Sequence, residues 1–311
     1  MLGGEIGFEK VGFDAEFARN VCPTRLECML GNLWVLARRG RGYNCACDGP
    51  LMLKLHHTGD WAAGQVRVTW APSTHAMPPE VQELIERTWN EISTRPGMIF
   101  FDGPMCRLEG ARSTPAELDL TFSKTSYKPF FGTNLQHPEL ADRYGEKVLA
   151  NPVGVSPALL TADKWLVFGH RNANVAYYPN RIHPFAGALE PREQVDIFQE
   201  VRRELKEELE FGEEDIKSIH CTGLVEDARL RQPELIFRVE STRTRDEIRS
   251  RMDLTEHHEI WSIPATRAAV EGAMGDRMLL TPIALASMLL WGRLAFGEAW
   301  FEQERAKLAS V

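Results

Sequence analysis

One segment, residues 198–211, constrains this chain most, because it combines a helical apolar stripe with a cluster of carboxylates. Wound as an α-helix, it places four apolar side chains on one narrow face: Phe198, Val201, Leu205 and Leu209. Four acidic side chains share the neighbouring sector: Glu200, Glu204, Glu207 and Glu208. The segment therefore predicts a helix that packs through one face and gathers carboxylates beside it.

The acidic sector brings like charges together, since Glu204 lies one helical turn from both Glu200 and Glu208. A solvated helix face usually sets Glu against Lys or Arg at this spacing, whereas each like-charge pair costs roughly 0.2–0.5 kcal/mol. Mg²⁺ would offset the repulsion, because it binds one or two carboxylates together with waters and substrate phosphate oxygens. Arg203, four residues before Glu207, would orient one carboxylate. The pattern favours a cation site over a solvated face.

These residues also carry a resemblance to a known family. The stretch from Arg203 to Glu208 reads Arg-Glu-Leu-Lys-Glu-Glu and matches the Arg-Glu-aliphatic-X-Glu-Glu core of the Nudix box. The chain thus resembles the Nudix hydrolases, which cleave nucleoside diphosphates linked to another group. Gly187 and Glu193 keep the first spacing of the box, two additional residues precede Arg203, and Glu210 stands where the box has Gly.

Three regions are expected along the chain. Residues 1–63 show no sustained period and are interpreted as a loosely attached extension. Residues 64–150 predict a smaller N-terminal α/β lobe, with strands separated by Gly and Pro around one helix. Residues 151–311 resemble the Nudix domain, an α/β/α sandwich, and end in a C-terminal helix with Thr281 as N-cap and Pro282 in the first turn.

The expected substrate comes from a second resemblance. Residues 125–134, a polar and aromatic segment interpreted as a loop, are similar to the corresponding part of the Nudix hydrolases that act on UDP-glucose and UDP-galactose. The segments 151–155 and 165–168 share this similarity. The resemblance implies Mg²⁺-dependent hydrolysis, with Mn²⁺ as a second option, to UMP and sugar 1-phosphate. Two alternatives stay open: a hydrolase of ADP-ribose, NADH or CoA, and a nucleotide-sugar sensor without catalysis.

The acidic helix supplies the expected catalytic groups. By resemblance, Glu204 and Glu208 are the first metal ligands, Glu207 is a third ligand or the base, and Glu200 is an auxiliary. Arg203 is expected to orient a carboxylate rather than touch the substrate. The general base is sought among Glu207, Glu226 and Glu234, because all three are suitable by residue type.

Residues outside the helix are candidates for substrate contacts. They are Tyr127, Asn134, Arg171, His183 and Gly187. Arg171 suits a phosphate, whereas the aromatic ring and the amide suit uracil or a sugar. Except for Gly187, which belongs to the box loop, each is interpreted equally well as a structural residue.

Composition limits the partners and the compartment. The net charge of −8 argues against a duplex-binding surface, because phosphate backbones require clustered Lys and Arg, so no nucleic-acid partner is expected. The sequence has no apolar run of about 18 residues and no signal-peptide pattern, which predicts a cytoplasmic protein without a membrane partner. The apolar run at 283–291 is expected to pack in the core or against a partner helix, so a homodimer is one expectation.

Overall fold

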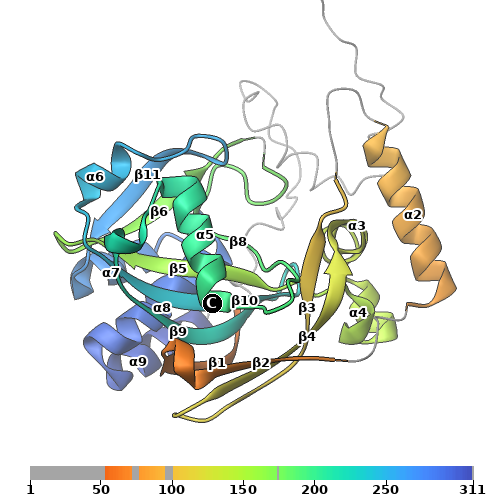
Figure 1. The fold of residues 1–311 in the computed structure, drawn as a ribbon, viewed down its shortest axis with the longest axis horizontal. Helices are drawn as coiled ribbons and strands as arrows, with labels where there is room; N and C mark the ends of the chain where they lie inside the picture. The colour runs from red at the N-terminus through yellow and green to blue at the C-terminus, as the bar shows by residue number, and fades with distance from the viewer. Residues whose placement is uncertain (1–52, 72–76, 95–100, 174, 310–311) are drawn as a thin grey trace, which may run out of the picture. The chain divides into compact units, whose positions relative to one another are not determined.

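Strands that are distant in sequence join in one central sheet (Figure 1). The computed structural model describes residues 53–71, 77–94, 101–173 and 175–309. The order across the sheet is β1 (Leu53–Trp61), β9 (Ile216–Asp227), β10 (Gln232–Ser241), β5 (Gly154–Leu160), β6 (Trp165–Arg171) and β11 (His257–Pro264). β10 and β5 run parallel, and the other neighbours are antiparallel. Two short strands complete the sheet: β7 (Ile182–His183) pairs with β6, and β8 (Gly187–Ala188) pairs with β5.

A second, three-stranded sheet packs on the first and shares its core. Its order is β2 (Val66–Trp70), β4 (Leu118–Ser126) and β3 (Pro104–Ser113). Leu120 and Phe122 of β4 are buried in the same hydrophobic cluster as Val155 of β5. Backbone hydrogen bonds also link the sheets, because the amide of Cys106 donates to the carbonyl of Leu189 at 2.7 Å. All described residues belong to one unit that begins at residue 50.

Helices cover both faces of the central sheet. α5 (Ile197–Leu209) packs into the cluster that includes Val155 and Phe237, whereas α8 (Pro282–Phe296) packs into a separate cluster that includes Ala158 and Ile236. Since Phe237 and Ile236 are consecutive residues of β10, the two helices lie on opposite faces. The predicted α/β/α sandwich is confirmed. The remaining helices are α2 (Pro79–Ser93), α3 (Tyr127–Phe130), α4 (Leu140–Tyr144), α6 (Arg245–Arg249), α7 (Arg267–Met274) and α9 (Glu298–Ala309).

Two local predictions from the sequence are confirmed. All four apolar residues of the 198–211 stripe are buried against the sheet. Thr281 is the N-cap of α8, with its hydroxyl accepting a hydrogen bond from the amide of Ala284 at 3.1 Å. The apolar run at 283–291 is buried within this chain, so α8 belongs to the core. Among the described helices, none combines the length and apolarity that a membrane span requires.

The expected loop at residues 125–134 is wrong. The segment begins in the end of β4, forms α3 and continues into a π-helical turn, Phe131–Leu135. The reason is its apolar spacing: Tyr127, Phe130 and Phe131 recur at intervals of three and four residues, which one helical face buries. The interpretation as a loop rested on the polar and aromatic composition of the segment and missed this period.

The expected extension at residues 1–63 differs from the structure at its C-terminal end. Residues 1–52 lie outside the described residues, but β1 forms an edge of the central sheet and pairs with β9 from Leu53 to Trp61. Two register shifts interrupt this pairing. They break the alternation of buried and exposed residues, and therefore the sequence pattern does not reveal the strand.

Candidate active site

Polar groups gather at one end of the central sheet, where β5 and β10 begin and β6 ends. The register fixes this geometry, because Gly154 lies beside Glu234 while Leu160 pairs with Leu166 at the opposite end of the strands. β8 pairs with the start of β5 and brings Gly187 to the same place. Four candidates from the sequence therefore come together through strand pairing: Arg171, His183, Gly187 and Glu234.

The ends of α5 are set by local interactions. Asp196 is the N-cap, and its Oδ1 accepts hydrogen bonds from the amides of Phe198 at 2.8 Å and Gln199 at 3.2 Å. At the other end Glu210 adopts a left-handed conformation with φ of 52°. This is the position where the Nudix box has Gly, a residue that adopts this conformation without steric cost. The helix end thus keeps its shape with a different residue.

Arg203 binds three of the four glutamates on α5. Its guanidinium donates to Glu200 Oε1 at 2.7 and 2.9 Å, to Glu207 Oε2 at 2.6 Å, and to Glu204 Oε1. Glu200 is buried, whereas the Glu207 side chain is 58% exposed. Arg203 therefore offsets much of the like-charge repulsion within the helix, and Glu207 reaches it from the solvent side.

Glu204 is buried against the backbone of β8. A Cβ atom at Gly187 would overlap the Glu204 carboxylate, so only glycine leaves room for this approach. Burial raises the pKa of Glu204 to about 8, the carboxylates of Glu208 and Glu200 raise it as well, and Arg203 opposes the shift. Gly187 therefore lies behind a metal-ligand candidate, where it positions a carboxylate.

Glu208 is the box glutamate that Arg203 does not bind. Its Oε2 is buried and has no hydrogen-bond partner among the described residues, and its Oε1 lies 3.5 Å from Nε2 of His257. Burial raises the pKa of Glu208 well above its ordinary range, and the carboxylate of Glu256 raises it further. Ligand atoms of Glu208, Glu256 and His257 all lie within 4.8 Å of one another.

These contacts test whether the site suits a divalent cation. A buried carboxylate oxygen without a partner is costly, and a metal ion is one of the few partners that offset such a cost. Within the described residues, the groups that meet the 4.8 Å criterion are this one and His170, His258 and Glu259. The four glutamates of α5 do not form such a group by themselves. The residues present fit a cation at Glu208, whose ligand atom lies near those of Glu256 and His257.

Glu256 and His257 were missed by the sequence analysis. They join the site because β11 pairs with the end of β6, with His257 opposite Arg171. Burial, followed by the charge of Arg171, lowers the pKa of His257 to about 4, so its imidazole is neutral at pH 7. The run Glu256-His257-His258-Glu259 before a predicted strand was the available signal.

Arg171 provides the positive charge of this region. It is buried, its guanidinium lies over the Tyr177 ring at 4.9 Å, and its Nε has no hydrogen-bond partner among the described residues. Its charge opposes the rise in pKa of both Glu208 and Glu234. A buried guanidinium with an unused donor is suited to bind a phosphate oxygen.

Two further candidates are buried near Arg171. His183 Nδ1 lies 2.9 Å from Thr281 Oγ1, and burial lowers the pKa of His183 well below its ordinary value. Glu234 accepts a hydrogen bond from Ser156 Oγ at 2.6 Å and rests on Gly154. Burial raises the pKa of Glu234 to about 8. The His183 imidazole is therefore uncharged at pH 7. The Glu234 carboxyl is mostly protonated below a pH of about 8.

Asn134 belongs to the scaffold, and the expectation that it contacts substrate does not fit its surroundings. Its side chain has no exposed surface, and its Nδ2 donates to the carbonyls of Leu230 and Arg231 at 3.0 Å. Its Oδ1 accepts a hydrogen bond from the amide of Asn151 at 3.1 Å. The amide therefore ties the π-helical turn to the β9–β10 turn.

Tyr127 packs in an aromatic cluster. Its ring lies edge-on to Trp89 at 6.2 Å and to Phe130 at 6.0 Å. The same cluster includes the partly buried ring of Tyr177, which lies under Arg171. Tyr127 therefore connects the α2 and α3 region to the Arg171 side of the site.

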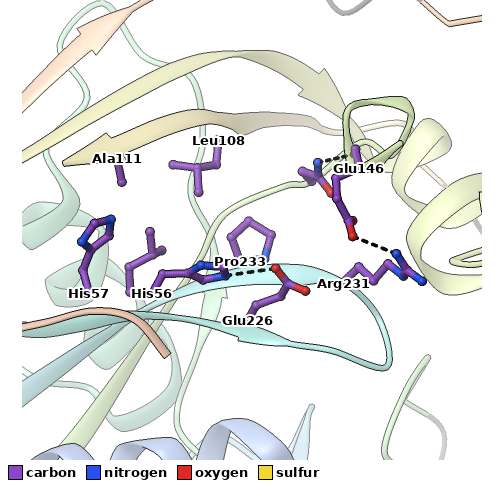
Figure 2. A pocket seen from close by; sticks show the side chains of 10 residues that line it. His56, His57, Leu108, Ala111, Glu146, Glu226, Arg231 and Pro233 are labelled. Atoms are coloured by element: carbon purple, nitrogen blue, oxygen red, sulfur yellow. Dashed lines mark hydrogen bonds and ion pairs between the residues drawn. The ribbon is translucent and has the colours of Figure 1, made fainter. Parts of the chain in front are cut away.

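Glu226, a candidate base, lies in a separate pocket of about 250 Å³ between β1, β3 and the start of β10 (Figure 2). It is paired with Lys54 at 2.7 Å and His56 at 3.0 Å. These two partners lower its pKa, although burial opposes them. Arg231 lines the same pocket and pairs with Glu146 at 2.8 Å.

Comparison with known proteins places this geometry in context. No protein-family model matches the chain. The mouse (Mus musculus) uridine diphosphate glucose pyrophosphatase NUDT22 is 34% identical over 155 residues, which cover 45% of this chain and 50% of the relative. The human (Homo sapiens) protein of the same name is 32% identical over 143 residues, covering 41% and 46% of the two chains. The chain spans about half the length of the curated relatives it matches.

Solved structures show weaker similarity. A Nudix hydrolase from Nitrosomonas europaea is 18% identical with a TM-score of 0.30, over 45% of this chain and 87% of that one. A Deinococcus radiodurans structure is 14% identical with a TM-score of 0.34, over 44% and 80%. The predicted resemblance is confirmed by the sequence relatives: the chain resembles the Nudix hydrolase superfamily and, within it, the uridine diphosphate glucose pyrophosphatases.

Proposed function

We propose that the protein is a divalent-cation-dependent diphosphatase that hydrolyses UDP-glucose and UDP-galactose to UMP and sugar 1-phosphate. One observation carries the proposal: Glu204 is buried, and Glu208, one helical turn further along, is 12% exposed and keeps a buried oxygen without a partner in the described part of the chain. Such carboxylates are costly in an apolar surrounding unless a cation binds them. The arrangement therefore favours a cation site on α5.

The chemistry matches the charges of the site. A bound divalent cation neutralises a diphosphate, orients it and lowers the pKa of water. Glu204 and Glu208 would hold that cation, and Arg171 would bind a non-bridging oxygen of the diphosphate through its unused donor. Hydrolysis adds the oxygen of water to one phosphorus and breaks the bond from that phosphorus to the bridging oxygen.

Two carboxylates, Glu207 and Glu234, are candidates for the group that receives the proton of water. Glu207 is 58% exposed and paired with Arg203, so it faces solvent. Glu234 is buried beside Ser156, and its pKa of about 8 leaves it mostly protonated at pH 7. Glu234 therefore fits a base whose activity rises with pH, whereas Glu207 fits a base that acts from the solvent side of the site.

The substrate rests on the relatives. The curated proteins that match this chain at 32–34% identity are named as UDP-glucose pyrophosphatases. The matched segments cover less than half of this chain. The sugar and the nucleobase of the substrate are therefore the parts of the proposal that a direct assay tests.

A substrate panel tests the assignment. The full chain is incubated with UDP-glucose, UDP-galactose, ADP-ribose, NADH and CoA, with Mg²⁺ or Mn²⁺ and with chelator. We expect turnover of the UDP sugars with cation and none with chelator. Turnover of ADP-ribose without cleavage of UDP sugars would overturn the substrate, and tight binding of UDP-glucose without hydrolysis would indicate a sensor. Glu208→Gln should abolish turnover, whereas Glu213→Gln, at a side chain that is 74% exposed and outside the site, serves as the control.

A further inference from the structure

We infer that His257 supplies a nitrogen ligand, through Nε2, to the cation bound by Glu208, and that the site therefore prefers first-row transition ions such as Mn²⁺ over Mg²⁺. The inference rests on the cation site of the proposed function and extends it to a ligand outside the box helix. Two groups support it: the buried imidazole of His257 and the carboxylate of Glu208, which has a buried oxygen without a partner among the described residues.

The imidazole ring of His257 is buried, and its nitrogens have no hydrogen-bond partners among the described residues. His257 is 1% exposed, and the atoms without a partner are Nδ1 and Nε2. The edge of Phe185 packs against the ring at a centroid distance of 5.3 Å, and Gly169 provides space that a Cβ would fill. A buried polar ring without partners is costly, and it is one of the commonest metal ligands.

The distance between His257 and Glu208 also suits a shared ion. Nε2 lies 3.5 Å from Glu208 Oε1, and neither ring nitrogen makes a hydrogen bond to a described residue. Two ligands on one metal with bonds of about 2.1 Å lie about 3.0–3.4 Å apart in octahedral or tetrahedral geometry. The pair therefore needs only a small adjustment to coordinate one ion.

Two carboxylates complete the set. Glu208 Oε2 is buried without a partner, and Glu256 brings a third ligand atom within 4.8 Å of those of Glu208 and His257. Glu208 belongs to α5, Glu256 precedes β11 and His257 is the first residue of β11, so the ion would join the helix to the edge of the sheet. Such a link explains why these unpaired groups face one another.

The ligand types determine the preference for the ion. Mg²⁺ and Ca²⁺ bind oxygen ligands almost exclusively, whereas imidazole nitrogen favours transition ions in the order of increasing affinity from Mn²⁺ to Cu²⁺. One imidazole among carboxylates therefore shifts selectivity toward Mn²⁺ and later ions. The expected result is at least about tenfold tighter binding of Mn²⁺ than of Mg²⁺, with most of this ratio lost in His257→Gln.

Electron spin echo envelope modulation of Mn²⁺ bound to the full chain tests the inference without an activity readout. At one equivalent of Mn²⁺ we expect modulation from a directly coordinated ¹⁴N, which changes to the ¹⁵N pattern in protein made with ¹⁵N-histidine. Isotope labelling needs no substitution, so the test does not depend on the folding of a variant. His257→Gln should remove the modulation, and His258→Gln, the neighbouring exposed histidine, should retain it.

The possible results separate the two proposals. Tight Mn²⁺ binding without nitrogen modulation overturns the role of His257 and leaves the cation site of the proposed function intact. Modulation that disappears in His258→Gln and persists in His257→Gln also overturns it, because the nitrogen then comes from the group of His170, His258 and Glu259. Equal Mn²⁺ binding by wild type and Glu208→Gln overturns the cation site itself, and with it both proposals.

Discussion

The carboxylate of Glu204 lies so close to Gly187 that any Cβ at position 187 would overlap it. This contact joins the two ends of the box, because Gly187 belongs to β8 and Glu204 to α5. The glycine is needed for close approach and not for an unusual backbone conformation, since its φ is not in the left-handed region.

Gly187→Ala should therefore displace Glu204 while leaving the fold intact. We expect at least about tenfold lower cation affinity and kcat/KM, with a loss of about 1–3 kcal/mol in the free energy of unfolding from overpacking. Calorimetric cation titration and denaturation measure the two effects. Gly272→Ala in α7 is the matched control, because open space surrounds that position, and it should retain activity and gain up to about 1 kcal/mol. Equal activity of both variants would show that the contact has no role.

Glu208→Gln should stabilise the cation-free protein and remove its response to cation. Burial raises the pKa of Glu208, so the folded state disfavours its ionised form and the neutral amide relieves that cost. In thermal unfolding, we expect a higher Tm than wild type without cation and little further rise when cation is added. Glu207→Gln, at an exposed position, should change the free energy of unfolding by less than about 1 kcal/mol. A cation-dependent rise in Tm that survives Glu208→Gln would be inconsistent with this site.

Glu234 should make stability fall as pH rises. Its pKa is raised by burial from 4.5 to about 8. Below the lower value both states hold the proton, whereas between the two values the unfolded chain releases it and the folded chain retains it, so the folded state loses stability through this window. Glu234→Gln removes this loss, and its advantage over wild type in free energy of unfolding should grow to a few kcal/mol between about pH 5 and pH 8. Urea denaturation across that range measures it, and an advantage independent of pH would refute the explanation.

Asn134→Ala should destabilise the fold more than it changes substrate affinity. The substitution leaves the carbonyls of Leu230 and Arg231 and the amide of Asn151 without a buried partner. We expect a loss of about 2–4 kcal/mol in the free energy of unfolding, summed over these groups. Asn90→Ala, exposed on α2, should stay within about 0.5 kcal/mol. A change in KM for UDP-glucose at unchanged stability would instead place Asn134 in the substrate site.

The sequence predicted those parts of the molecule whose signals are local. The stripe of Phe198, Val201, Leu205 and Leu209 and the cap at Thr281 depend on spacings within one helix, and the structure contains them. The helical period of Tyr127, Phe130 and Phe131 was also local, but the polar residues among these rings led to the interpretation as a loop.

The rest of the site depends on strand pairing, which no local pattern specifies. His257 reaches Arg171 only because β11 pairs with β6. Four strands (β7, β8, β9 and β10) and the helices α5 and α6 lie between β6 and β11 in the sequence. The sequence also does not show which glutamates pair with Arg203 and which stays unpaired, because this depends on which carboxylates the Arg203 guanidinium reaches. Spacing alone treats Glu207 and Glu208 as equivalent, yet one is exposed and paired while the other is nearly buried with an unpaired oxygen.

Phosphorus NMR of the products of UDP-glucose tests the central claim most directly. Incubated with the full chain and Mn²⁺ or Mg²⁺, UDP-glucose should lose both diphosphate resonances and yield UMP and glucose 1-phosphate in equal amounts, and neither should form with Glu208→Gln. Retention of the diphosphate, either as unchanged UDP-glucose or as UDP released with free glucose, would contradict cleavage at the diphosphate by the Glu204 and Glu208 site.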